Sequence, residues 1–300
     1  MKVERFINNP IIEPGMSASI GKNINGPSLI RVPNWLEKPL GRYYLYFAHH
    51  RGTFIRLAYA DQLEGPWSIY EPGTLQLGDS YCDHHIASPD VHVDEKRHEI
   101  RMYYHGRLPE GSQGAKVSVS SDGTKVSQGT KVSVSSDGVN FTCYETTLGW
   151  PYFRVFQWGG YYHALVGRGI FYRSRDGLTD FKRTAVLFSR DMRHDALKLD
   201  GNTLYVFYTN VGDVPEHILL ATVELRDDWM SWKETDAVTV VKPETDYEGV
   251  DLPLEPSVRG LATQRVRQLR DPAIYEEDGA TYLLYSVAGE SGIAIARLIF

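Results

Sequence analysis

The sequence has little cysteine, no long apolar run and no excess of positive charge, and each absence excludes a class of protein. Two cysteines in 300 residues, Cys82 and Cys143, do not make a disulfide framework. They could form one bridge or two free thiols, and we favour free thiols in a reducing compartment. No run of 18 apolar residues is present, which excludes a transmembrane helix. The formal net charge of -6 offers no basic footprint for nucleic acid.

The N-terminal MKVERFINNP has no apolar signal region, so we expect a cytoplasmic protein, although a chain that had lost a leader would look the same. Amphipathic helix patterns are scarce as well. Short runs rich in Tyr, Val, Ile and Phe are separated by Gly, Pro, Asp and Asn, which is typical of β-strands and turns. The 19 tyrosines and 6 tryptophans suit strands, and they also provide stacking surfaces for sugar rings.

The strand-like runs recur in one order: an apolar strand, a turn, an aromatic strand, a third strand and often a fourth. A strand set that recurs about every 40 to 60 residues predicts a propeller, whereas a β-sandwich would not explain five copies. We therefore predict an all-β fold, a single five-bladed β-propeller domain over residues 1–300. The fifth unit lacks a clear fourth strand, and residues 6–12 are expected to supply it and close the ring. The predicted blades cover approximately residues 20–75, 83–146, 149–186, 190–240 and 266–300.

One octapeptide, KVSVSSDG, occurs twice, at residues 116–123 and again at 131–138. Ser-Asp-Gly favours turns, and SRDG at the matching place in the third blade assigns one copy to the blade pattern. The spare copy is expected to form an extra hairpin or loop at the rim of blade two, with no function assigned.

Several phrases of the sequence resemble the five-bladed glycoside hydrolases of family 43 and their relatives: NNPII, NGPSLI, YADQLEGPWSIY, ASPDVHV and RDPAIY. The resemblance spans nearly the whole chain and implies a carbohydrate substrate. Enzymes of that family carry an Asp base before blade one, an Asp modulator before blade three and a Glu acid before blade four. This sequence departs from all three, with Asn25 at the first place, Trp150, Pro151 and Tyr152 at the second, and Arg193, His194 and Asp195 at the third.

Other ionisable groups near the predicted blade entrances could take over the chemistry. Glycoside hydrolysis needs two groups that flank the scissile bond and differ in pKa. We expect Asp271 or Asp90 to act as base or nucleophile, and His194 or Glu255 to act as acid. Relatives in which a histidine serves as the acid support His194. Each aspartate could instead form a turn or a hydrogen bond that locks a blade.

Histidines and arginines complete the candidate site. No tight ligand spacing such as HExxH is present, so no metal site and no required cofactor is predicted, although the resemblance allows a structural cation such as calcium in the axial channel. Arginine binds carboxylate or sulfate in a bidentate manner, so a uronic acid would explain several arginines, with surface ion pairs as the alternative. The predicted substrate-binding residues are Asn25, His49, His50, His85, His105, Arg154, His163, Asp195 and Arg270.

Further arginines, including Arg193, Arg259, Arg265 and Arg267, also lie near predicted blade entrances. Residues 246–268 are long for a blade connection, and we expect them to cover part of the funnel. The sequence therefore predicts a carbohydrate-active enzyme, a glycoside hydrolase acting on a glycan in the funnel. The alternatives are a catalytically inactive glycan-binding propeller, or a lyase with a His or Tyr base. Two carboxylates about 5 to 10 Å apart would favour hydrolysis.

Overall fold

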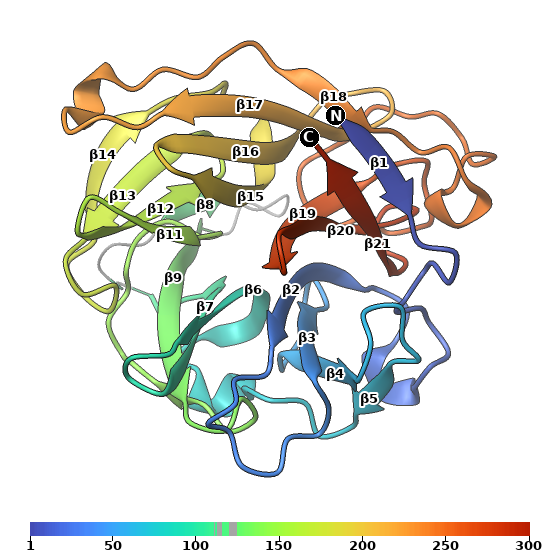
Figure 1. Ribbon diagram of the computed structural model, residues 1–300, viewed down its shortest axis with the longest axis horizontal. Coiled ribbons are helices and arrows are strands. Elements are labelled where there is room, and N and C mark those ends of the chain that lie inside the picture. Colours follow the sequence, from blue (N-terminus) through green and yellow to red (C-terminus); the bar gives the residue numbers. More distant parts are fainter. Residues whose placement is uncertain (111, 113–115, 120–124) are drawn as a thin grey trace.

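The computed structural model describes residues 1–110, 112, 116–119 and 125–300, and these form five antiparallel sheets around a central axis (Figure 1). The prediction of an all-β, five-bladed β-propeller is confirmed. Helical structure in the described residues consists of four short 3-10 turns, η1 (Ala18–Ile20), η2 (Leu77–Asp79), η3 (Trp229–Ser231) and η4 (Asp246–Glu248). None of the helices that the structure describes is long and apolar enough to cross a membrane.

The strands of a blade follow one another from the axis outward. Blades one and two contain β2 (Asn25–Arg31), β3 (Tyr43–Ala48), β4 (Arg56–Ala60) and β5 (Ser68–Tyr70), then β6 (Asp83–Asp94), β7 (Glu99–Arg107), β9 (Lys125–Ser135) and β10 (Thr142–Cys143), with β8 (Lys116–Val119) paired to β9. Blades three and four contain β11 (Arg154–Trp158), β12 (Tyr161–Val166), β13 (Ile170–Ser174) and β14 (Lys182–Val186), then β15 (Met192–Asp200), β16 (Thr203–Asn210), β17 (Ile218–Glu224) and β18 (Val238–Val241). Blade five contains β19 (Arg270–Glu277), β20 (Ala280–Ser286), β21 (Ile293–Ile299) and β1 (Lys2–Arg5).

The N-terminal strand β1 completes the last blade. It pairs antiparallel with β21, from Lys2 opposite Ile299 to Arg5 opposite Ala296, so the two ends of the chain lie side by side (Figure 1). This strand precedes the segment 6–12 that the sequence favoured. In that segment Ile12 forms an isolated bridge to Ile293, and the backbone N–H groups of Phe6 and Ile11 also donate to carbonyl oxygens of β21. The ring is therefore closed because strands from the two ends of the chain pair within one blade.

The apolar core lies between neighbouring blades, and strand β3 shows why. Tyr43, Leu45 and Phe47 pack toward blade five, whereas Tyr44 and Tyr46 pack toward blade two. Side chains of a strand alternate between its two faces, and in a propeller both faces of each sheet are covered by another sheet. The second strands therefore have nearly continuous apolar and aromatic sequences, and the described core separates into five clusters, one for each blade interface.

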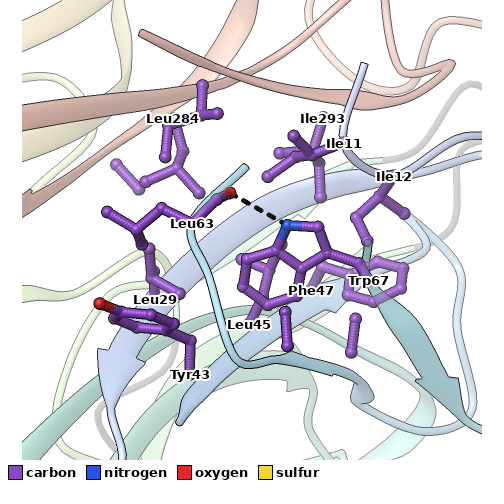
Figure 2. Packing of buried hydrophobic residues seen from close by; sticks show 14 of the residues in the cluster. Ile11, Ile12, Leu29, Tyr43, Leu45, Phe47, Leu63, Trp67, Leu284 and Ile293 are labelled. Atoms are coloured by element: carbon purple, nitrogen blue, oxygen red, sulfur yellow. Dashed lines mark hydrogen bonds between the residues drawn. The ribbon is translucent and has the colours of Figure 1, made fainter. Parts of the chain in front are cut away.

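The interface between blades one and five shows this packing at close range (Figure 2). Phe47 and Leu45 of β3 meet Leu284 of β20 and Ile293 of β21, and Trp67 fills the space at the edge. The indole N–H of Trp67 donates to the carbonyl oxygen of Leu63 at 3.2 Å, so the buried ring leaves no polar group unpaired.

The second copy of the repeated octapeptide forms a regular blade turn. In blade two, Asp137 accepts from the backbone N–H groups of Val139 and Asn140, both at 2.8 Å. In blade three, Asp176 accepts in the same way from the backbone N–H groups of Leu178 and Thr179, which follow the Ser-Arg-Asp-Gly turn. The first copy begins in β8, which pairs with β9 beside the main sheet, and its residues 120–123 lie outside the described residues.

Candidate functional site

Each blade has a residue with left-handed backbone in, or just before, its inner strand. Gly26, Ser88, Tyr152, His194 and Asp271 have φ values of 59°, 51°, 77°, 48° and 46°. Left-handed backbone costs a residue other than glycine roughly 1 kcal/mol or more, and such strain gathers at functional sites. Four strained side chains at equivalent positions therefore mark this end of the propeller as the candidate site.

Glycine is required at the first of these positions. A Cβ atom on Gly26 would lie 3.1 Å from the Cα atom of Ser88, so the inner strands of blades one and two approach too closely for a side chain. The strained position of blade one thus contributes backbone only, and the functional groups come from the other blades.

A cavity of about 680 Å³ is lined by two of these five residues. Its wall includes Tyr152 and His194 together with polar residues from the loops that follow the second strands. A larger groove of about 980 Å³ lies at the rim of blade two, lined by Cys82, Cys143 and Lys131 among others. Tyr81 and His84 on its wall also have left-handed backbone, but the groove contains none of the five inner-strand residues, so we place the site in the cavity at the axis.

Asp271 and His194 form the centre of the site. The Nε2 atom of His194 lies 3.5 Å from Oδ1 of Asp271, and both side chains are buried. Burial, and then the nearby charge of Glu290, raises the pKa of Asp271 from 3.8 to about 6. Burial, and then the charge of Arg193, holds the pKa of His194 well below 6.5. At neutral pH the histidine is therefore uncharged, while the aspartate titrates close to neutrality.

A buried ion network supports this pair from behind. The guanidinium of Arg270 is 2.9 Å from Oε2 of Glu216 and 3.0 Å from Oε1 of Glu290. Gln268 accepts from the same guanidinium at 2.6 Å. Burial opposes the ionisation of Glu290, but His50, Asn23 and Arg270 outweigh it and lower the pKa of Glu290 to about 2. Glu290 is thus a fixed negative charge beside Asp271.

Aromatic rings form another side of the cavity. The rings of His105 and Tyr152 stack with centroids 4.4 Å apart, and the Tyr152 ring lies 5.5 Å from that of His194. His85 contacts His105 edge to face at 6.2 Å. Burial is the main reason that the pKa of His85 falls to about 4 and that of His105 falls well below 6.5. The rings are therefore neutral, as a stacking surface for a sugar requires.

The long connection before blade five reaches the cavity. Arg193 donates to the carbonyl oxygen of Val258 at 2.6 Å and to that of Gly260 at 3.3 Å. Gly260 and Arg259 line the cavity. Residues 246–268 thus cover part of the funnel, as the sequence analysis expected.

Comparison with known proteins agrees with this architecture. No model of a known protein family matches the chain. It is 37% identical over 335 residues to the uncharacterized protein R118 of Acanthamoeba polyphaga mimivirus, an alignment that covers 99% of this chain and 90% of that protein. The chain belongs to the family of this mimivirus protein.

Among solved structures, a glycosyl hydrolase from Bacteroides ovatus has a TM-score of 0.68 at 12% identity, with 99% of this chain and 93% of that chain covered. The GH43_1 enzyme from Xanthomonas citri, also solved with xylose and with xylotriose, has a TM-score of 0.61 at 12% identity, with 96% and 91% covered. The expected resemblance to the five-bladed propellers of family 43 is thus confirmed, and at these identities it is a likeness of fold.

The structure gathers most of the predicted binding residues at one end of the axis. His50, whose Nδ1 atom is 3.5 Å from Glu290, lines the cavity with His105 and His194. Asn25 donates to Glu290 at 3.0 Å behind this wall. His85 and Arg270 belong to the aromatic and ionic layers described above. His49, half-buried, lies in the turn after β3 and accepts from the backbone of Arg51.

Asp90 and Glu255, two of the predicted catalytic residues, do not join Asp271. Asp90 lies two residues farther along β6 than Ser88, where it accepts from the backbone N–H of Val155 and contacts His92, both at 2.8 Å. It faces a separate axial cavity of about 110 Å³. Glu255 is exposed on the long connection, and only its backbone carbonyl accepts from Gln268. Neither residue lines the cavity at the strained positions.

Arg154 and Asp195 lie on the inner strands and take part in the contacts between blades near the axis. Arg154 donates to the carbonyl oxygens of Asp195 and Pro89, both at 3.0 Å, and so links the inner strands of blades two, three and four. The Asp195 carboxyl is buried and accepts no hydrogen bond from the described residues. Burial raises its pKa to about 8. Within the described ranges, no group of three or more His, Cys, Asp or Glu side chains is placed to hold a metal ion.

His163 lies between blades three and four, away from the funnel. Its ring stacks on Phe156 at 5.1 Å and lies 5.5 Å from Trp232. The side chain points into the blade interface because His163 occurs in the middle of β12, where alternate residues face the neighbouring sheet. It is a core histidine and contributes nothing to the cavity.

Glu216 and Glu290, the two acidic residues of the buried network, were not among the residues predicted from the sequence. Each follows the second strand of its blade, as His50 and Arg168 do in blades one and three. His50 and Arg168 come two residues after their strands, Glu290 four and Glu216 six, so no fixed spacing marked the two glutamates in the sequence. Tyr152 was noted only as a departure from the family pattern, although it opens an inner strand.

Proposed function

We propose that this protein binds a carbohydrate in the axial cavity and hydrolyses a glycosidic bond there, with Asp271 as the proton donor. One observation carries the proposal: the Asp271 carboxyl is buried beside a neutral histidine and a fixed negative charge, and its pKa is raised to about 6. A carboxyl that keeps its proton up to about pH 6 is what protonation of a leaving oxygen needs.

His50 is our candidate for the second group, which activates water. Its side chain is partly exposed at the cavity wall, and its Nδ1 atom faces Glu290 at 3.5 Å. An acidic partner behind a histidine orients the ring and stabilises the charge that it gains on taking a proton. His50 also influences the pKa of Asp271, so the two groups lie within electrostatic reach. His194, neutral and bound to Arg193, positions Asp271 and does not donate the proton.

A second candidate, glycan binding without hydrolysis, has its own support. None of the described residues that line the cavity is an aspartate or glutamate. The nearest carboxylates, Asp271, Glu216 and Glu290, are at most 2% exposed. A propeller that had kept its cleft and lost its catalytic pair would have this arrangement, so binding and turnover must be measured separately.

The test is a panel of oligosaccharides and aryl glycosides, each assayed both for a thermal shift and for product release. Asp271→Asn should reduce kcat by about 10²-fold or more, the usual contribution of a general acid, while binding is kept. His50→Gln should likewise reduce kcat while binding is kept. His49→Gln is the matched control, because His49 is the neighbour of His50 in the sequence but does not line the cavity.

Activity should fall as pH rises above about 6, because Asp271 then loses its proton. Full turnover in Asp271→Asn would show that Asp271 is not the proton donor. Binding without product from any glycoside, for the unaltered protein, would support the second candidate instead.

A further inference from the structure

The axial cavity contains a cluster of positive charge. Three arginines line it: Arg168 from the loop after β12, Arg193 at the start of β15, and Arg259 from the long connection before blade five. No aspartate or glutamate is among the described lining residues. Three guanidinium groups that share one concave wall repel each other unless an anion lies between them.

The acidic residues nearby do not neutralise this charge. Glu216 and Glu290 are both paired with Arg270, and only Glu216 approaches Arg193, at 3.7 Å. Arg193 also donates hydrogen bonds to the carbonyl oxygens of Val258 and Gly260 and to His194, so its guanidinium is already paired within the protein. The positive charge that faces the cavity therefore comes mainly from the other two arginines.

Arg168 has no acidic partner among the described residues, and its Nε atom is buried without a hydrogen-bond acceptor. Its backbone is left-handed, with φ at 70°, and its backbone N–H donates to Met192 at 3.0 Å, which fixes the base of the side chain beside the cavity. A buried guanidinium nitrogen without an acceptor is costly unless a ligand supplies one.

Arg259, on the long connection before blade five, provides the other positive charge of the cavity. Its side chain is 44% exposed and, among the described residues, its polar partners are Asp191, at 3.6 Å, and the carbonyl oxygen of Arg190. Burial, followed by the charges of Arg168 and Arg193, lowers the pKa of Arg259. Arg168 and Arg193 are therefore close enough to Arg259 to affect its charge.

We propose that the cavity selects glycans that carry an acidic group, a uronate carboxylate or a sulfate ester, which Arg168 and Arg259 bind while the sugar ring packs against Tyr152. The inference rests on the proposed binding of a glycan in this cavity. Guanidinium matches both oxyanions with paired hydrogen bonds, and a neutral aromatic face suits the apolar side of a sugar ring. An acidic sugar would both pair with the arginines and pack against the aromatic ring, whereas a neutral sugar would leave the arginines without an anion.

The experiment is calorimetric titration with matched saccharide pairs. Oligosaccharides of galacturonic and of glucuronic acid are compared with their methyl esters, which lack the charge and carry one added methyl group per ester, and galactose 6-sulfate is compared with galactose. Inorganic sulfate is titrated alone. The acidic member of at least one pair should bind about tenfold tighter or more, as expected for one or two charge-assisted hydrogen bonds, and added salt should reduce that preference.

Arg168→Gln and Arg259→Gln should each remove the preference, so that the acidic saccharide binds no tighter than its neutral partner. Arg226→Gln is the matched control, because Arg226 is exposed beyond the end of β17, whereas the cavity lies at the opposite end of that blade. Arg168→Lys should restore part of the preference, since it restores the charge without the planar fork.

Each other result has a distinct meaning. Equal affinity for charged and esterified saccharides, unchanged in both variants, would overturn the acidic preference and leave glycan binding intact. If no saccharide binds, the proposed function itself fails. Arginine-dependent binding of inorganic sulfate without any saccharide would overturn both, because the cavity would then be a site for a free anion.

Discussion

Replacing Asp271 by asparagine should make the protein more stable at neutral pH, although the same change removes the proposed proton donor. The carboxyl is 2% exposed, and its Oδ1 atom accepts no hydrogen bond from the described residues. Asparagine has the same shape, tolerates the left-handed backbone at φ 46°, and carries no charge to be desolvated. The substitution therefore tests the electrostatics of the site with little change in packing.

The expected size follows from the pKa. Burial and then Glu290 raise the pKa of Asp271 from 3.8 to about 6. One pKa unit corresponds to about 1.4 kcal/mol, so ionised Asp271 costs the folded state about 3 kcal/mol at pH 7. The folded state keeps a proton between pH 4 and 6 that the unfolded chain has released, so stability falls as pH rises through that interval. Asp271→Asn should gain most above pH 6 and little below pH 4.

The assay is urea denaturation of both proteins at a series of pH values from 4 to 8. Asp278→Asn is the matched control, because Asp278 has φ at 50° and is exposed in a turn of the same blade. That change should leave the free energy of unfolding within about 0.5 kcal/mol, as for most surface substitutions. If Asp271→Asn is no more stable than the unaltered protein at pH 7, or if its gain does not depend on pH, Asp271 is not electrostatically strained.

Two further changes test the interior. Arg270→Met should cost about 3–5 kcal/mol of unfolding free energy, because it leaves Glu216 and Glu290 buried without their cation, and adding Glu216→Gln with Glu290→Gln should restore most of the loss in the same denaturation assay. No recovery in the triple variant would contradict this account. His163→Phe should flatten stability between about pH 4 and pH 6.5, because burial lowers the pKa of His163 to about 4 and the unaltered protein loses stability as pH falls through that range. An unchanged slope in thermal melts over that range would show that His163 is not its source.

The inner strands were predictable because their sequence repeats. NGPSLI, ASPDVHV and RDPAIY share a small or acidic residue, a proline and then an apolar strand, and the structure gives Gly26, Ser88 and Asp271 the same left-handed backbone. His194 and Asp271 were selected for this reason, since each opens an inner strand. Asp90 was selected by the same logic, but it lies two residues farther along β6 and faces a different cavity.

The loops after the second strands were harder to interpret. Glu216 lies in a connection of irregular length, and Glu290 follows a strand that ends in small residues, so neither belongs to a repeated motif. Their importance depends on Arg270, which lies far from Glu216 in sequence and contacts it only when blades four and five pack together. A spacing pattern in one chain does not encode such a contact.

Hydrophobic periodicity and turn residues by themselves determined the strands, the fivefold repeat and the all-β class, because these features depend on interactions between residues near in sequence. The tertiary structure alone decided which charges meet. Burial and the distances between blades set the pKa of Asp271, place His163 in an interface instead of the funnel, and bring Arg168 and Arg259 to one wall. The chemistry of the cavity therefore depends on the closure of the ring, since only then do loops from separate blades surround the same space.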